Sequence, residues 1–174
     1  MLAVAALSAR ALVESAALDG TRTVALDCFG DADTRRLAAQ WHEVGAASAL
    51  CIDDDKLLAS LSALAQRGDT MGWIAGSGFD GRADLLERGA ALLPLIGTAP
   101  ADVRRVRDPQ EFFGVLHSHG IGFPSVSLDP PATPAGWLLK DAGGCGGWQV
   151  RRASPGTTAG PGRYWQRERR GAAM

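Results

Sequence analysis

Short apolar runs alternate with amphipathic segments over the first hundred residues. Stretches with helical spacing separate the apolar runs, and the first of these begins at Ser8, which we expect to be its N-cap. Near-continuous apolar strands separated by helices are typical of a parallel sheet covered on both faces. We therefore predict a Rossmann-like α/β domain over residues 1–100. Its expected strands are LAVAA (2–6), TVALD (23–27), SALCI (48–52), MGWIA (71–75) and LLPLI (92–96), and its expected helices are 8–20, 31–40, 56–68 and 82–89.

The pattern changes after Pro100. The segment DPQEFFGVLHSHGI (108–121) predicts a linker helix, because Pro109 suits a first helical turn and Gly120 a helix end. A proline-rich connection follows and completes a linker over residues 101–136. The segment WLLKDAGGCGGWQVRRA (137–153) then joins two strand-like runs through a glycine-rich loop, which predicts an antiparallel hairpin. A further strand is expected at YWQRE (164–168), so residues 137–174 form the start of a second domain.

Charge and composition exclude several classes of function. The chain has 18 basic and 19 acidic side chains, so no bulk positive field is present to attract nucleic acid or an anionic membrane surface. No apolar run reaches the length of about 18 residues that a membrane span needs. The amino-terminal twenty residues lack a basic n-region, which argues against a signal peptide. The 3 cysteines show no CxxC spacing, so neither a disulfide framework nor a zinc site is indicated, and a cytoplasmic protein is expected.

The segment GSGFDG (76–81) matches GxGxxG and lies between a predicted strand and a predicted helix. In dinucleotide folds such glycines allow the pyrophosphate to approach a helix N-terminus. Here the motif follows the fourth strand rather than the first. A turn at the sheet edge, a ligand-lining loop and a dinucleotide site therefore stay open. Asp27 ends the second strand without a glycine fingerprint beside it, which favours a helix-capping or surface role over ribose binding.

Lys140 stands at the end of an apolar strand and is followed by the glycine-rich run GGCGG. The chain has only one other lysine, Lys56. A point positive charge beside bare backbone amides suits phosphate oxygens, although a flexible hairpin with a solvated lysine is the plain alternative. A Walker A loop is excluded, because the lysine precedes the glycines. His117 and His119 face different ways on a helix, so no metal site is expected there.

These segments together resemble the ATP-grasp family. WLLKDAGGCGGWQVRRA followed by YWQRERRG is similar to the opening of an ATP-grasp domain. AALSARALVESAALDG, VALDCFGDADTRR, IAGSGFD and VRDPQEFFGVLHSHGIGFPSV resemble the preceding pre-ATP-grasp domain and linker helix of an uncharacterised bacterial group, some of whose members accompany pterin-cofactor biosynthesis in one-carbon metabolism. The resemblance covers nearly the whole chain.

The resemblance implies specific binding residues. The ATP site would consist of Lys140 and the loop glycines on the phosphates and of a hinge strand along the adenine, that is Lys140, Gly143, Gly144, Gly146, Gly147, Gln166, Arg167 and Glu168. Substrate-binding residues would come from two loops, namely Ser8, Arg10, Gly76, Ser77 and Gly78. Many relatives carry a second phosphate lysine near the start of the linker helix, where this chain has arginines such as Arg107. The Mg²⁺ ligands would lie beyond the hinge strand and outside this chain.

The resemblance implies the amino-terminal portion of an ATP-dependent carboxylate–amine ligase. ATP would phosphorylate a carboxylate, and an amine would then displace the phosphate. We expect the chain to be incomplete and inactive alone, with small-molecule partners and homodimer formation left open. A non-catalytic nucleotide- or metabolite-binding α/β module is the alternative, and a dinucleotide-dependent oxidoreductase is a weaker one. An ATP-versus-NAD titration separates the oxidoreductase from the other two.

Overall fold

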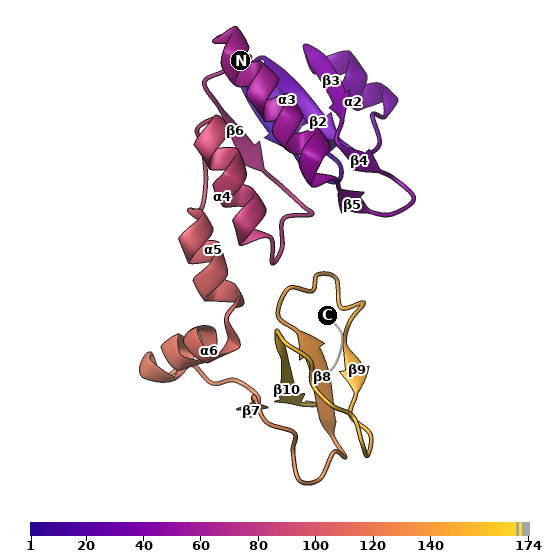
Figure 1. Cartoon of the computed structure of the whole chain (residues 1–174), viewed down its shortest axis with the longest axis vertical. Helices are drawn as coiled ribbons and strands as arrows, with labels where there is room; N and C mark the ends of the chain where they lie inside the picture. The colour runs from indigo at the N-terminus through magenta and orange to yellow at the C-terminus, as the bar shows by residue number, and fades with distance from the viewer. Residues whose placement is uncertain (170, 172–174) are drawn as a thin grey trace. The chain divides into compact units, whose positions relative to one another are not determined.

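A computed structural model describes residues 1–169 and 171. The chain divides into two compact units, Met1–Pro100 and Ala101–Met174 (Figure 1). In the part of the chain that the structure describes, no helix is long and apolar enough to cross a membrane.

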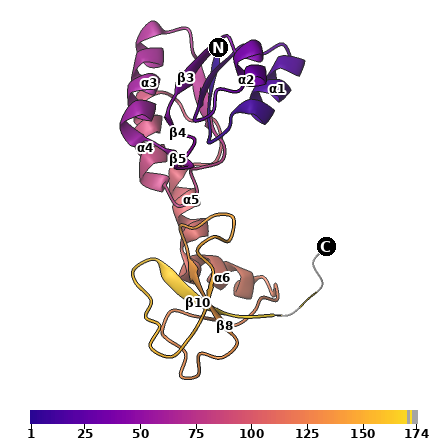
Figure 2. The ribbon, with the colours of Figure 1, turned by 90° about the vertical axis from the view of Figure 1, so that its right-hand side faces the viewer.

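The first unit contains a parallel sheet of four strands in the order β3-β2-β1-β6. Helices α1 and α2 lie on one side of this sheet, and α3 and α4 on the other (Figure 2). All five residues of β2 are buried, as central strands in a covered sheet require. The strands are β1 (Leu2–Ala5), β2 (Thr23–Asp27), β3 (Gln40–Glu43) and β6 (Gly72–Ala75), and the helices are α1 (Arg10–Leu18), α2 (Ala32–Leu37), α3 (Asp54–Arg67) and α4 (Ala83–Leu92).

The third sheet strand differs from the expectation. SALCI was expected to provide it, but the structure uses Gln40–Glu43, which lies at the edge of the sheet and is only partly buried. An edge strand carries no continuous apolar run, so its sequence gave no strand signal. Cys51–Ile52 instead forms β5 and pairs antiparallel with β4 (Gly45–Ala46). The pairing depends on Gly45, where a Cβ atom would lie 2.2 Å from the carbonyl oxygen of Cys51.

Two further expectations in the first unit were wrong. LLPLI forms no strand, because α4 continues to Leu92 and only Leu95 makes an isolated parallel bridge to Trp73. Ser8 is not the N-cap of α1. Ala9 occupies that position and provides no side-chain cap.

The second unit begins with two helices, α5 (Pro100–Arg107) and α6 (Pro109–Ser118). The predicted linker helix is α6, and its start is fixed by Asp108, whose carboxylate accepts hydrogen bonds from the amides of Gln110 and Glu111. Helix α5 was not predicted, since its charged sequence has few apolar positions to reveal a helical period.

An antiparallel sheet in the order β7-β10-β8-β9 completes the second unit. Leu139 and Trp165 lie opposite each other in its register, and both are buried. The predicted hairpin is present as β8 and β9, and the predicted third strand is β10. The fold class is therefore confirmed, with a parallel α/β sheet followed by a linker helix and an antiparallel glycine-loop hairpin. The strands are β7 (Val126–Ser127), β8 (Trp137–Asp141), β9 (Arg151–Arg152) and β10 (Arg163–Arg167).

Candidate functional site

A cavity of about 400 Å³ lies within the second unit, beside the glycine-rich loop. This volume is within the range of about 300–1,000 Å³ that small-molecule sites occupy. Strand β8 contributes Lys140 and Asp141, the loop contributes Gly144 and Gly147, and further lining residues come from α5, α6 and β10. The cavity therefore has a cationic side chain and glycine backbone on the same wall.

Lys140 is half-buried, and its amine donates a hydrogen bond of 2.6 Å to Oε1 of Gln166. The two residues come from the paired strands β8 and β10. Within residues 1–169, the structure shows no carboxylate at ion-pair distance from Lys140. The amine of Lys140 therefore has a neutral hydrogen-bond acceptor beside it and no neutralising carboxylate. Its positive charge would stabilise an anion in the cavity.

A second cation lines the same cavity. Arg107, the last residue of α5, donates a hydrogen bond of 3.1 Å from Nη1 to the carbonyl oxygen of Gly144. Tyr164 also lines the cavity. Burial raises the pKa of its hydroxyl, and the charge of Arg107 opposes this shift. Arg107 is therefore close to both the glycine loop and Tyr164.

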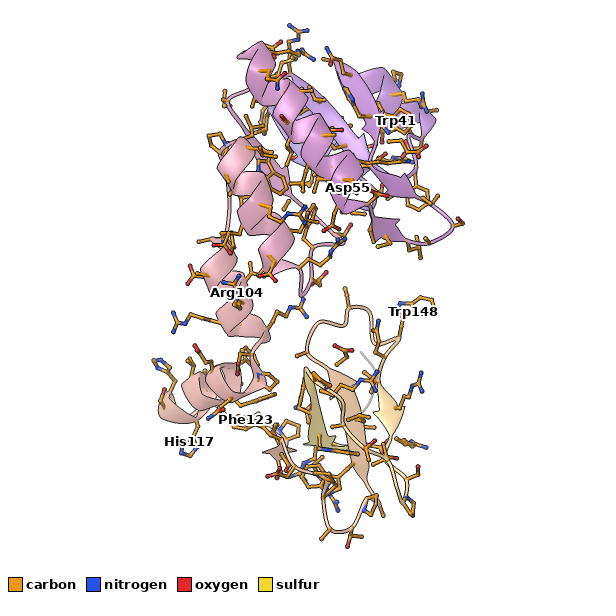
Figure 3. All side chains as sticks on the ribbon, viewed as in Figure 1. Trp41, Asp55, Arg104, His117, Phe123 and Trp148 are labelled. Carbon is orange, nitrogen blue, oxygen red and sulfur yellow. The ribbon has the colours of Figure 1, made fainter. Side chains whose placement is uncertain are left out.

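The glycine loop requires glycine at several positions. Gly146 and Gly147 have φ angles of 68° and 75°, which side chains other than glycine rarely adopt. The amide of Gly143 donates to Asp141 Oδ1 at 2.9 Å. Trp148 follows the glycines and is 84% exposed (Figure 3). The conformation of the loop therefore depends on its glycine backbone angles, while the side chain of Trp148 lies mostly in solvent.

The three predicted hinge residues, Gln166, Arg167 and Glu168, have side chains with different partners. Gln166 accepts a hydrogen bond from Lys140. The guanidinium of Arg167 donates to the carbonyl oxygen of Ala135 at 2.9 Å, and Glu168 pairs with Arg152 at 2.8 Å. Neither Arg167 nor Glu168 is among the cavity-lining residues. The structure thus brings together Lys140, Gln166 and the glycine loop, and it directs the other two side chains elsewhere.

The predicted substrate loops lie side by side in the first unit. The amide of Leu7 donates to the carbonyl oxygen of Ser77 at 2.8 Å, and the amide of Gly76 donates to Ala5 at 2.8 Å. These loops follow β1 and β6, where the strand order reverses, and ligands of open α/β sheets bind at such points. Ser8 and Ser77 are exposed there.

Close packing accounts for glycine within GSGFDG. Gly78 has a φ of 97°, and a Cβ atom there would lie 2.8 Å from Cγ of Leu7.

Arg10, the first residue of α1, pairs with Glu14 at 3.0 Å and with Asp33 at 2.6 Å. The hydrogen bond that Arg10 donates to Glu14 and the charge of Asp33 raise the pKa of Arg10. Its guanidinium is therefore already engaged by two carboxylates.

Asp27 is fully buried and organises the loop that carries Ser8. Its carboxylate accepts hydrogen bonds from the amide of Ala9 at 3.0 Å, from the amides of Phe29 and Gly30, and from Nε1 of Trp41 at 2.7 Å. The surface role is wrong, because Asp27 is buried. Its carboxylate binds the amide of Ala9, the N-cap residue of α1, so it supports the start of this helix from β2.

The remaining candidates are the histidines of α6 and the cysteines. Among residues 1–169 and 171, no group of three or more His, Cys, Asp or Glu side chains could hold a metal ion. His117 is exposed on α6 (Figure 3). Of the cysteines, Cys28 is buried, whereas Cys51 and Cys145 are exposed.

The fold of this chain was compared with those of known proteins. No protein-family model and no curated protein matches the chain. Solved structures do match. Biotin carboxylase from Campylobacter jejuni in complex with β-γ-ATP superposes with a TM-score of 0.67 and 15% identity over 97% of this chain and 44% of that one. The biotin carboxylase domain of the Hydrogenobacter thermophilus 2-oxoglutarate carboxylase, in complex with MgADP, ADP and bicarbonate, superposes with a TM-score of 0.64 and 15% identity. The match covers 87% of this chain and 37% of that one.

The fold is that of the amino-terminal part of ATP-grasp enzymes. N5-carboxyaminoimidazole ribonucleotide synthetase from Thermus thermophilus also matches, with a TM-score of 0.60 and 14% identity over 95% of this chain and 46% of that one. The chain thus spans 37–46% of the length of these ATP-grasp structures. The resemblance found in the sequence is confirmed for the fold.

Proposed function

We propose that this chain is the amino-terminal portion of an ATP-dependent carboxylate–amine ligase and that it binds ATP in the cavity beside Lys140. The observation that carries the proposal is the meeting of Lys140, Arg107 and the glycine loop around one cavity of ligand size. The matched structures support it, since two of them contain an adenine nucleotide.

In the proposed mechanism, Lys140 binds the phosphates and the glycine loop, with Gly143, Gly144, Gly146 and Gly147, closes over them. Gln166, Arg167 and Glu168 would line the adenine along the hinge strand, where the side chains and amides of Arg167 and Glu168 already have protein partners. Arg107 supplies a second positive charge. These cations would stabilise the charge on the transferring phosphoryl group without rearrangement during the reaction.

The proposed reaction has two steps. An oxygen of the carboxylate attacks the γ-phosphorus of ATP, which forms an acylphosphate and releases ADP. The amine then attacks the acyl carbon and displaces phosphate. We propose that the loops bearing Ser8, Arg10, Gly76, Ser77 and Gly78 bind one of the two substrates. Magnesium would accompany the nucleotide phosphates, but the described residues do not form a binding set for it, so no step here is assigned to a magnesium ligand.

The matched pair of lysines provides the test. Lys140→Ala should weaken Mg-ATP binding at least tenfold in isothermal titration, because a hydrogen bond to a charged group contributes about 1.5–3 kcal/mol. Lys56→Ala removes the other lysine, which is exposed and pairs with Glu43 in the first unit, and it should leave the affinity unchanged. Equal affinities of the two variants would contradict the proposal. Tighter binding of NAD than of ATP would instead favour the dinucleotide alternative.

The assembly state is a separate part of the proposal. One matched structure is of a biotin carboxylase domain dimer. We propose a homodimer for the protein that contains this chain, which light scattering would test.

A further inference from the structure

Two of the three cysteines lie next to each other in the first unit. Cys28 follows β2 and is buried, whereas Cys51 lies on β5 and is exposed. The thiol of Cys28 donates a hydrogen bond of 3.7 Å to the backbone carbonyl oxygen of Cys51. The two residues are 23 positions apart in the sequence, so the fold brings them together.

Gly45 on β4 permits this contact. A Cβ atom at Gly45 would lie 2.8 Å from Sγ of Cys28 and 2.2 Å from the carbonyl oxygen of Cys51. A residue with a side chain at this position would therefore separate the β4–β5 hairpin from the buried thiol.

A local movement would bring the two sulfur atoms together. A carbonyl oxygen lies about 2.4 Å from Cα of its own residue, so Sγ of Cys28 is no more than about 6 Å from Cα of Cys51. The sulfur of Cys51 lies 3.4 Å from the carbonyl oxygen of its neighbour Ile52. A disulfide therefore requires this side chain to rotate and the hairpin, with two residues in each strand, to adjust.

The two thiols differ in their access to an oxidant. Burial raises the pKa of the Cys28 thiol, and the charges of Asp27 and Cys51 raise it further. Cys28 therefore stays protonated and shielded from solvent, whereas Cys51 lies at the surface. An oxidant that arrives from solvent meets Cys51 first.

We infer that Cys28 and Cys51 form a reversible disulfide when a peroxide oxidises the exposed thiol. The sulfur of Cys51 takes one oxygen from hydrogen peroxide, whose O–O bond breaks, and becomes a sulfenic acid while one water is released. The sulfur of Cys28 then attacks that sulfur. The S–S bond forms, the S–O bond breaks, and the hydroxyl leaves as a second water with the proton of Cys28. Two thiols are thus oxidised and one peroxide is reduced.

The disulfide would restrain the proposed substrate loops. The amide of Cys28 donates to the carbonyl oxygen of Leu7 at 3.1 Å, and the amide of Leu7 donates to that of Ser77 at 2.8 Å. A Cβ atom at Gly78 would lie 3.1 Å from Cδ1 of Ile52 on β5. A cross-link from Cys28 to β5 would therefore limit the local opening of both loops. The inference concerns the first unit alone and does not depend on nucleotide binding.

Peptide mapping of the oxidised chain tests the inference. The full chain is treated with one equivalent of hydrogen peroxide, the remaining thiols are blocked, and the chain is digested with trypsin without reductant. Cleavage after arginine and lysine places each cysteine in a peptide of its own, namely 23–35, 37–56 and 141–151. We expect the first two peptides to be joined in the monomeric chain, with a mass two hydrogen atoms below their sum. Dithiothreitol should separate them.

Variants separate the roles of the cysteines. Cys145→Ser is the control, because Cys145 belongs to the second unit, and it should retain the cross-link. In Cys28→Ala, Cys51 should instead accumulate as a sulfenic acid that dimedone captures. Hydrogen exchange of the Leu7 amide should slow in the oxidised chain, and an unchanged rate would contradict the restraint on the loops.

The unmodified chain decides the inference even if a variant fails to fold. Oxidation of Cys51 to a sulfinic acid while Cys28 stays reduced would overturn it. A cross-link that forms no faster in the folded chain than in urea, or that joins other peptides, would overturn it as well.

Discussion

At the scale of single residues, Asp27 is the clearest structural determinant. It is a buried carboxylate at the end of β2 whose two oxygens accept four hydrogen bonds, from the amides of Ala9, Phe29 and Gly30 and from Nε1 of Trp41. Asp27→Asn replaces one acceptor oxygen by a donor that would face these N–H groups. We expect the free energy of unfolding to fall by about 1–3 kcal/mol, as for a buried group left without its partner.

Urea unfolding followed by circular dichroism measures this loss. Asp19→Asn is the control, because Asp19 is an exposed residue at the end of α1 whose side chain has no comparable role. If both variants unfold at the same urea concentration, the capping role of Asp27 is wrong.

Single residues could be predicted as site residues from the sequence where a rare or clustered residue type marks them. Lys140 and its glycines stood out because lysine is rare here and four glycines occur in five positions. The sequence could not reveal that Asp33 pairs with Arg10, since Asp33 reaches it from a different helix. Such pairs depend on tertiary packing rather than on local spacing.

At the scale of elements, α6 depends on its N-cap. Asp108 satisfies the amides of Gln110 and Glu111, and replacement of an N-cap aspartate by alanine costs about 1 kcal/mol. Asp108→Ala should therefore accelerate hydrogen exchange of the α6 amides about fivefold. Asp129→Ala changes an exposed loop aspartate and should leave those rates unchanged. Identical exchange in both variants would show that the cap is not what starts the helix.

Elements with a strong local signal were predicted, and elements defined by their neighbours were not. α6 has proline, a capping aspartate and a terminal glycine in its own sequence. β3 is a strand because it pairs with β2, and its residues Gln40–Glu43 give no apolar alternation. The β4–β5 hairpin was mistaken for a sheet strand because SALCI is apolar, yet its pairing is set by Gly45.

At the scale of the whole molecule, the order of the elements identified the fold more reliably than any single motif. GSGFDG alone favoured no family, whereas the sequence of parallel sheet, linker helix and glycine hairpin matches solved ATP-grasp structures at 15% identity. The candidate site was predicted only in part. Lys140 and the loop came from the sequence, but the aromatic wall on α6 required the packing of Phe112 and Phe113 beside β8 and β10.

The central claim is that ATP phosphates bind Lys140 and the glycine loop. Its most direct test is a titration of the ¹⁵N-labelled chain with Mg-ATP, followed by amide NMR spectra. The account predicts that the largest shift changes occur at Lys140 and at Gly143, Gly144, Gly146 and Gly147. Shift changes confined to residues 76–81, or no change at the glycine loop at saturating Mg-ATP, would contradict it.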